Sequence, residues 1–161
     1  MTAFERGKSF GNDVTIAKAE YKDLQEILQL QYLAYQTEAA LFAEKSIPPL
    51  TQTLDEVISE YDDGIILKMV AGNKIIGSVR AAEKNGKIYI GKLMVHPSFR
   101  RNGYGRKLLT EMERSYPGRK YRLFTSTRSI GNIRLYKSLG YRIYDQKRVS
   151  DELEFVYLEK S

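Results

Sequence analysis

The chain has 161 residues, the length of one ordinary domain, and its composition of 42% apolar and 29% charged residues is that of a globular protein. It holds no cysteine and one histidine, which excludes a disulfide scaffold, a thiolate metal site, a cysteine nucleophile and a His-rich metal site. The net charge of +6 is uneven, with 10 basic and 13 acidic residues up to position 90 and 16 and 7 after it, so the second half favours a local anion site.

Neither the apolar runs nor the N-terminus of the sequence indicates a membrane or an export signal. No apolar run approaches the roughly 18 residues of a membrane span, and residues 1–8 lack the apolar segment of a signal peptide. We therefore expect a cytoplasmic protein without a membrane partner. Residues 1–12 are polar and aperiodic, which indicates a flexible N-terminal arm before a domain over residues 13–161.

The first half of the domain is predicted to contain one strand, two helices and three further strands. Alternating apolar residues predict the first strand over 14–17, and apolar residues at helical spacing predict helices over 21–42 and 54–61. The pair Pro48-Pro49 breaks the chain between these two helices. Antiparallel strands are predicted over 65–71, 74–83 and 87–95, with Asn85-Gly86 as a tight turn.

The second half alternates helices and strands. Helices are predicted over 103–116 and 130–139, and strands over 123–126, 141–149 and 153–158. The complete order is β-α-α-β-β-β-α-β-α-β-β. It predicts a single α/β domain with a mixed, mostly antiparallel sheet.

Residues 93–106 carry the most informative motif. An apolar strand ends there, a short basic loop follows, and Gly103 and Gly105 open an amphipathic helix. A helix N-terminus offers free N–H groups and a partial positive charge, and glycine lets a bulky anion approach the backbone closely. Three arginines add charge-assisted donors: Arg100, Arg101 and Arg106. The segment therefore predicts a pyrophosphate-binding site.

This phosphate-binding motif differs from two common ones. No Gly-Lys-Ser/Thr follows, as a Walker A loop requires, and a dinucleotide fingerprint needs glycine or alanine where Leu108 stands. The spacing Arg100-x-x-Gly103-x-Gly105 instead resembles the Q/R-x-x-G-x-G/A signature of the GNAT superfamily of N-acetyltransferases.

The resemblance to the GNAT superfamily extends over nearly the whole chain. The predicted order of elements matches the family over residues 14–158. Residues 93–97, with the pattern L-x-V-x-P, look like the family's fourth strand, and residues 132–141 look like its second conserved block. The resemblance thus rests on two motifs in the family's order, about 30 residues apart.

The resemblance implies acetyl-CoA as the acetyl donor. Its pyrophosphate would lie on N–H groups from about Arg101 to Arg106, and its pantetheine arm would pair with the fourth strand like an added strand. The expected cofactor-binding residues are Leu93, Met94, Val95, Arg100, Arg101, Asn102, Gly103, Tyr104, Gly105, Arg106, Asn132 and Tyr136.

The resemblance also implies direct transfer to an amine without a covalent acyl-enzyme, and the absence of cysteine agrees with this route. Asn132 and Tyr136 are four residues apart, so they share one helix face. Tyr136 matches the family's tyrosine near the CoA sulfur. It is expected to be the general acid, with positioning of the sulfur as the alternative. A backbone N–H near Val95 is the expected oxyanion donor.

The general base is less defined than the acid. Many relatives carry a glutamate on the fourth strand, where this chain has Ile90 and Gly91. Glu83 and Glu38 are the expected substitutes as catalytic residues, and a water chain without a single base is the alternative. His96 stands where relatives often have a histidine with a structural role, and we expect that role here.

The acceptor site is expected between the first two helices and the middle strands. The candidate residues there are Tyr32, Tyr35, Glu38, Glu44, Arg80, Glu83 and Tyr89. Tyrosines at helical spacing also fit a half-buried core. Because the region before residue 91 is net acidic, a cationic acceptor is favoured: a small amine, a polyamine, an amino acid, or an amine of a peptide or protein.

Two other functions remain open at this point. The missing strand glutamate leaves a catalytically idle acyl-CoA-binding or sensor domain of the same fold as the main alternative. A nucleic-acid module is the other, but the basic residues gather at a helix start, which suits a compact diphosphate better. We therefore expect no nucleic-acid partner and no metal. GNAT-like domains often dimerise, and the sequence leaves a homodimer open.

Overall fold

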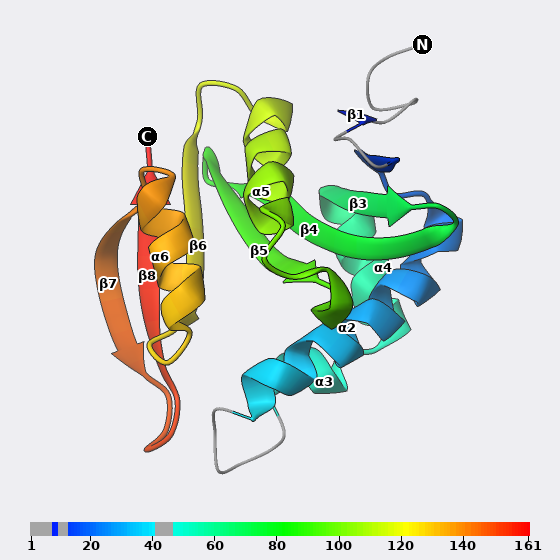
Figure 1. Cartoon of the computed structure of the whole chain (residues 1–161). Helices are drawn as coiled ribbons and strands as arrows, with labels where there is room; N and C mark the ends of the chain where they lie inside the picture. Colours follow the sequence, from blue (N-terminus) through cyan, green and yellow to red (C-terminus); the bar gives the residue numbers. More distant parts are fainter. Residues whose placement is uncertain (1–7, 10–12, 41–46) are drawn as a thin grey trace.

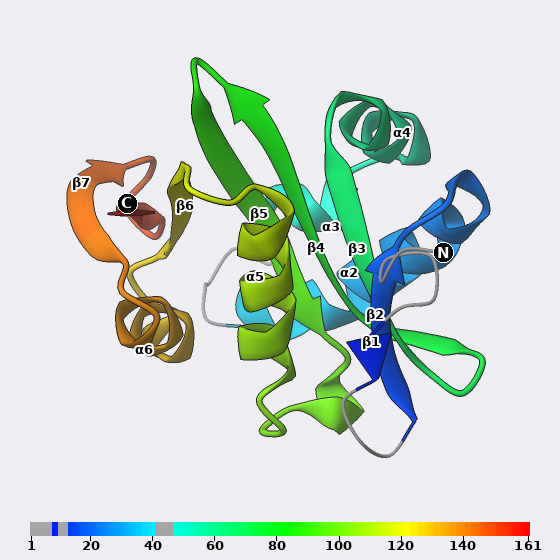
Figure 2. The same ribbon diagram turned by 90° about the horizontal axis from the view of Figure 1, so that it is seen from above.

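The computed structural model describes residues 8–9, 13–40 and 47–161. Eight strands form one twisted sheet in the order β1-β2-β3-β4-β5-β6-β8-β7. Helices α5 and α6 lie on one side of this sheet and α2, α3 and α4 on the other (Figures 1 and 2). The predicted α/β fold with a mixed, mostly antiparallel sheet is confirmed.

The N-terminal elements form one edge of the sheet and the helices of one layer. They are β1 (Lys8–Ser9), β2 (Val14–Lys18), the 3-10 helix η1 (Tyr21–Asp23), α2 (Leu24–Ala39), α3 (Pro48–Thr51) and α4 (Leu54–Asp63). Helix α4 begins as its sequence predicts, because Thr53 and Glu56 form a reciprocal capping box. The short helix α3 was not predicted. Its prolines occupy the first turn, where a missing N–H costs nothing.

Strands β3 (Ile65–Ala71), β4 (Lys74–Lys84) and β5 (Lys87–Val95) form the predicted antiparallel meander. The register between β4 and β5 shifts between Ser78 and Arg80, where one strand contains an extra residue. In this bulge Lys92 takes a left-handed backbone conformation with φ of 52°. The bulge lies in the part of β5 that also lines the inner cavity of the candidate active site.

The C-terminal half contains the 3-10 helix η2 (Pro97–Phe99), α5 (Tyr104–Ser115), β6 (Lys120–Ser126), α6 (Ile130–Ser138), β7 (Arg142–Arg148) and β8 (Glu154–Lys160). Strand β6 is parallel to β5 and antiparallel to β8, which in turn pairs with β7. The chain thereby divides the sheet into a larger N-terminal part and a smaller C-terminal part that meet at β5 and β6.

Two apolar clusters fix the helices to the sheet. On one side, Leu108, Leu109 and Met112 of α5 are fully buried against the sheet. On the other, Ile27 of α2 and Val57 of α4 are fully buried in a second cluster. Because burying such side chains stabilises the fold by roughly 1.5–3 kcal/mol each, these contacts attach α2, α4 and α5 to the sheet.

Most element boundaries agree with the sequence within a few residues. The predicted helix over 21–42 begins as a 3-10 turn, and its described part ends at Ala39. Of the predicted arm, Lys8 and Ser9 pair with Ile16 and Thr15 of β2, and the other residues up to 12 lie outside the described part. Among the described helices, none is both long and apolar enough to cross a bilayer.

Candidate active site

The site begins where the two parallel strands β5 and β6 separate. Strand β5 pairs with β6 only over Lys87–Tyr89, opposite Lys120–Arg122. Beyond these residues the strands diverge, as Figure 1 shows, so one edge of the second half of β5 is not paired with β6. Two adjoining spaces lie along this divergence. We call them the outer groove, of about 540 Å³, and the inner cavity, of about 260 Å³.

The outer groove lies between β5, the loop that follows it, the start of α5, the end of α2, and α6. It contains most of the residues expected to hold the cofactor. These are Leu93, Met94, Val95, Arg100, Arg101, Gly103, Tyr104, Gly105, Arg106 and Asn132. The structure therefore brings the residues of the 93–106 motif together in one groove. Asn132 joins them from helix α6.

The start of α5 is open to the outer groove. Gly103 precedes the helix with a φ of 75°, a left-handed conformation that glycine adopts without strain. It has no side chain with which to bond the first N–H groups of the helix, and a Cβ at this position would meet nothing within 4 Å. Free N–H groups and the helix dipole thus face a space that a phosphate can enter.

The three arginines of the motif are placed differently from one another. Arg100 donates from Nη2 to the carbonyl of Ala34 in α2 over 3.1 Å, and Arg106 donates from Nη2 to Ser138 Oγ over 2.7 Å. Arg101 is exposed and has a left-handed backbone with φ of 66°. All three line the groove and contribute positive charge to its walls.

Asn102 does not line the groove with its neighbours. Its side-chain amide donates to the carbonyls of Phe99 over 2.9 Å and Arg100 over 3.2 Å, so it braces the loop. Its expected contact with a cofactor therefore has no counterpart in the lining of either space.

Tyr136 lies in the inner cavity, and Asn132, one turn earlier on α6, lines both spaces. Tyr136 is 6% exposed, and burial, followed by the nearby Tyr35 and Glu38, raises the pKa of its phenol. The proton therefore stays on Oη throughout the neutral range. Asn132 Nδ2 is 3.4 Å from Thr125 Oγ1 of β6.

Glu38 lies at the junction of the two spaces. It stands near the end of α2, lines both the groove and the cavity, and accepts a hydrogen bond from the hydroxyl of Ser129. Tyr35, one turn earlier, also lines both. Burial and the neighbouring Glu38 raise the pKa of Tyr35. The negative charge of Glu38 is thus available beside two neutral phenols.

Glu83 does not join this group. It lies near the end of β4, forms an exposed ion pair with Arg119, and lines neither space. His96 is also elsewhere: its Nδ1 accepts from the N–H of Ser98 over 3.0 Å, which caps η2. Burial, together with Lys74 and Arg100, lowers the pKa of His96, so the ring is neutral at pH 7.

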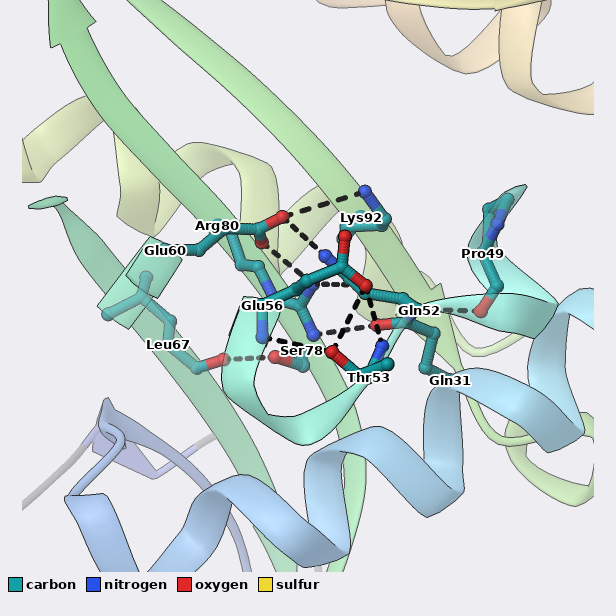
Figure 3. A network of polar contacts seen from close by, with 10 residues as sticks. All are labelled: Gln31, Pro49, Gln52, Thr53, Glu56, Glu60, Leu67, Ser78, Arg80 and Lys92. Carbon is teal, nitrogen blue, oxygen red and sulfur yellow. Dashed lines mark hydrogen bonds and ion pairs between the residues drawn. The ribbon is translucent and has the colours of Figure 1, made fainter. Parts of the chain in front are cut away.

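The other expected acceptor residues are divided between the cavity and a polar network beside it (Figure 3). Arg80, 4% exposed, donates to Glu60 over 2.9 Å, to Gln52 over 3.1 Å and to Gln31 over 2.7 Å. Tyr32 donates its hydroxyl to the carbonyl of Gln52. These contacts tie α2, α4 and the α3–α4 connection to β4, and neither Arg80 nor Tyr32 lines the groove or the cavity.

Two further expected acceptor residues do not contribute to the described walls. Tyr89 is 38% exposed and lines neither space. Glu44 lies outside the described residues.

Several lining residues of the inner cavity were not singled out by the sequence. They are Ile47, Pro48, Pro49, Lys92, Phe124, Leu153 and Phe155. They come from α3 and its start, β5, β6, the β7–β8 connection and β8, which only the folded chain brings together. Lys92 had one signal, since it is the only charged residue in the apolar stretch from 88 to 95.

Divergent parallel strands beside an open helix start fit the cofactor-binding α/β domain that the sequence indicated, and the comparisons with known proteins agree. A model of the acetyltransferase (GNAT) family matches residues 21–141. The chain belongs to this family, whose acetyl donor is acetyl-CoA, and the resemblance found in the sequence is confirmed. A comparison with curated protein sequences gives no match.

Solved structures show the same fold. The ribosomal-protein-S18-alanine N-acetyltransferase of Escherichia coli is 17% identical, with 91% of this chain and 92% of that chain covered and a TM-score of 0.76. The paia N-acetyltransferase of Thermoplasma acidophilum, in complex with coenzyme A, is 21% identical, with coverages of 91% and 98% and a TM-score of 0.70. The yncA protein of Salmonella typhimurium, with its cofactor acetyl-CoA, is 19% identical, with coverages of 92% and 93% and a TM-score of 0.69.

Proposed function

We propose that this acetyltransferase moves the acetyl group of acetyl-CoA directly to an amine, without a covalent acyl-enzyme, and that residues 13–161 form the catalytic domain. The observation that carries the proposal is the meeting of Glu38, Tyr35, Leu93 and Asn132 on the walls of both spaces. A donor in the groove and an acceptor in the cavity would react at this junction. The cytoplasmic location stays a prediction.

The outer groove suits the diphosphate and the pantetheine arm of acetyl-CoA. Two features support this: the open N-terminus of α5 with its arginines, and the edge of β5 at Leu93–Val95 that is free of β6. When bound, acetyl-CoA supplies the acetyl group as a thioester. A backbone N–H of the Leu93–Val95 segment is our candidate donor for the oxyanion.

We propose Tyr136 as the residue that stabilises the departing sulfur. An ordinary thiol has a pKa of about 8.5. Burial moves the pKa of Tyr136 above that of an ordinary phenol, so the hydroxyl donates a hydrogen bond to the sulfur more readily than it gives up its proton. Of the two alternative roles expected from the sequence, general acid or positioning of the sulfur, the raised pKa favours positioning by a donated hydrogen bond.

We propose Glu38 as the group that accepts the proton of the amine, directly or through water. An amine with a pKa near 10 must lose a proton before it attacks. Glu38 borders the cavity where the amine would stand, whereas Glu83 is bound to Arg119 outside it. The charge of Glu38 also favours the approach of the ammonium form of the acceptor.

The test is an acceptor screen with the purified chain. Acetyl-CoA is mixed with amino acids, peptides, polyamines and aminoglycosides in turn, and free thiol is measured against a control without amine. We expect thiol release with at least one class and an equal amount of N-acetylated product by mass spectrometry. Tight binding of CoA by calorimetry with no release above the control would contradict transfer and support the idle binding domain.

A further inference from the structure

The inner cavity has walls of two kinds. Among the described residues that line it, two are charged: Glu38 of α2 and Lys92 of β5. Most of the other walls are apolar or aromatic, including Ile47, Pro48, Phe124 and Phe155. An acceptor that fills this space therefore meets the carboxylate of Glu38, apolar surface, and a wall to which Lys92 contributes, with the Lys92 ammonium on the side of Glu60 next to the cavity.

Lys92 is held at the cavity by an unusual backbone. Its φ of 52° lies in the left-handed region that non-glycine residues seldom adopt, and it sits in the bulge opposite Ser78–Arg80. Four non-glycine residues of the described chain have a positive φ, and two of them, Lys92 and Arg101, line the two spaces. Such conformations cluster at binding sites, where the fold maintains them against their cost.

The ammonium of Lys92 is only weakly paired within the protein. Its ion pair with Glu60 spans 4.0 Å, beyond hydrogen-bond distance (Figure 3). Glu60 is already bonded to Arg80 over 2.9 Å and to Gln52 over 2.6 Å. Burial lowers the pKa of Lys92 and Arg80 lowers it further, while Glu60 and Glu56 act in the opposite direction. A partly buried cation in this state is stabilised by an additional anion.

We propose that the acceptor is a small amine that also carries a carboxylate, and that Lys92 binds this carboxylate while the amine stands on the Glu38 side. The inference rests on the function proposed above and specifies its substrate class. A cavity of roughly 150 Å³ is enough for benzene. The inner cavity, at about 260 Å³, has room for an amine with one apolar or aromatic group. A polyamine is disfavoured, because its second ammonium would face Lys92.

The test compares matched acceptors in matched variants. Leucine and phenylalanine are paired with their amides and with the amines that lack the carboxyl group, and kcat/KM is measured by thiol release. In the wild type we expect the carboxylate form to be favoured by roughly 10- to 100-fold, as for a charge-assisted hydrogen bond. Lys92→Gln should remove this preference, and Lys92→Arg should restore part of it. Lys87→Gln on the same strand lines neither space and should leave the preference intact.

The comparison separates binding from a structural role. If Lys92 only supports the fold through Glu60, Lys92→Gln will lower kcat/KM equally for both members of each pair, and the inference is wrong. It is also overturned if amines or peptides without a nearby carboxylate react as well as the acids, and acetyl transfer then still stands.

A calorimetric measurement decides the case in which no amine releases thiol. The same paired compounds are titrated into the CoA-saturated protein. Tighter binding of the acids that is lost in Lys92→Gln would support the carboxylate site even though the proposed transfer had failed. Equal binding of acids and amides would overturn the site itself.

Discussion

The outer groove and the inner cavity share one divergence between strands, yet their walls are built in different ways. Nine of the ten predicted residues that line the groove lie between Leu93 and Arg106, within one stretch of the chain. The cavity is lined from α2, α3, β5, α5, β6, α6, the β7–β8 connection and β8. Of the residues expected at the donor or acceptor site, it contains Tyr35, Glu38, Leu93, Asn132 and Tyr136.

This difference corresponds to two functions, binding of the donor diphosphate and selection of the acceptor. A diphosphate is bound by backbone N–H groups and a few arginines, which one loop and one helix start supply. An acceptor is selected by side chains whose positions depend on the packing of many elements. The groove therefore offers what a diphosphate requires, whereas the cavity contains the charged residues Glu38 and Lys92 among its walls.

The largest effect is expected from Gly103→Val, which tests the groove. Valine at a φ of 75° costs about 1–2 kcal/mol, so the loop should rearrange and move the N–H groups of α5. Loss of two charge-assisted contacts, each worth at least about 1.5 kcal/mol, should lower the affinity for CoA by at least roughly 100-fold. Calorimetry with CoA measures this.

Gly72→Val is the matched control for that change. Gly72 has a similar φ of 62° and open space at Cβ, but it lies in the β3–β4 turn, away from both spaces. It should lower stability by a similar backbone cost and leave CoA affinity unchanged. An unaltered affinity in Gly103→Val would show that the diphosphate binds elsewhere.

Tyr136→Phe tests the junction between the two regions. Removal of the hydroxyl should lower kcat by about 100-fold, the lower range for acid catalysis, with little change in CoA affinity. Tyr141→Phe is the control, since Tyr141 is also buried beside Tyr136 but bonds Glu113 and lines neither space. Equal losses in kcat and CoA affinity for Tyr136→Phe would mean that the residue only holds the donor.

The pair Glu38→Gln and Glu83→Gln sharpens the assignment of the base. Both changes remove one carboxylate charge, but only Glu38 borders the cavity. We expect kcat/KM to fall about 10-fold for Glu38→Gln, less than a complete loss because water can take over part of the proton transfer. Glu83→Gln should stay near the wild type. A larger loss of kcat/KM for Glu83→Gln than for Glu38→Gln would identify Glu83 as the base. No loss in either variant would indicate that a water chain accepts the proton.

The fold could be predicted where signals are local. Thr53 with Glu56, Asn85 with Gly86, and Gly103 each determine a cap or a turn with their immediate neighbours, and the structure contains all three. Glu83 was expected among the acceptor residues but lines neither space. The alternation of residues in a strand does not show at which position along the β4–β5 hairpin the site begins. That depends on where β5 and β6 separate, which is a tertiary property.

The position of Lys92 in the cavity wall likewise could not be predicted from the sequence. Its residue type was visible in the sequence, but its left-handed backbone follows from the extra residue in β5 opposite Ser78–Arg80. The apolar walls of the cavity likewise come from segments that no local pattern joins. Sequence therefore indicated the donor, and the folded structure was needed to propose the acceptor.

The smallest effect is expected from Asn102→Ala, which tests whether every residue of the motif binds the cofactor. Its amide holds the carbonyls of Phe99 and Arg100 and is exposed, so its loss should cost at most about 1 kcal/mol of stability. CoA affinity should fall only about 2- to 5-fold, through a looser loop that still carries Arg101 and Gly103. Urea unfolding and calorimetry measure the two effects. A loss as large as that of Gly103→Val would mean that the amide contacts the donor itself, because a bracing role cannot exceed the stability it supplies.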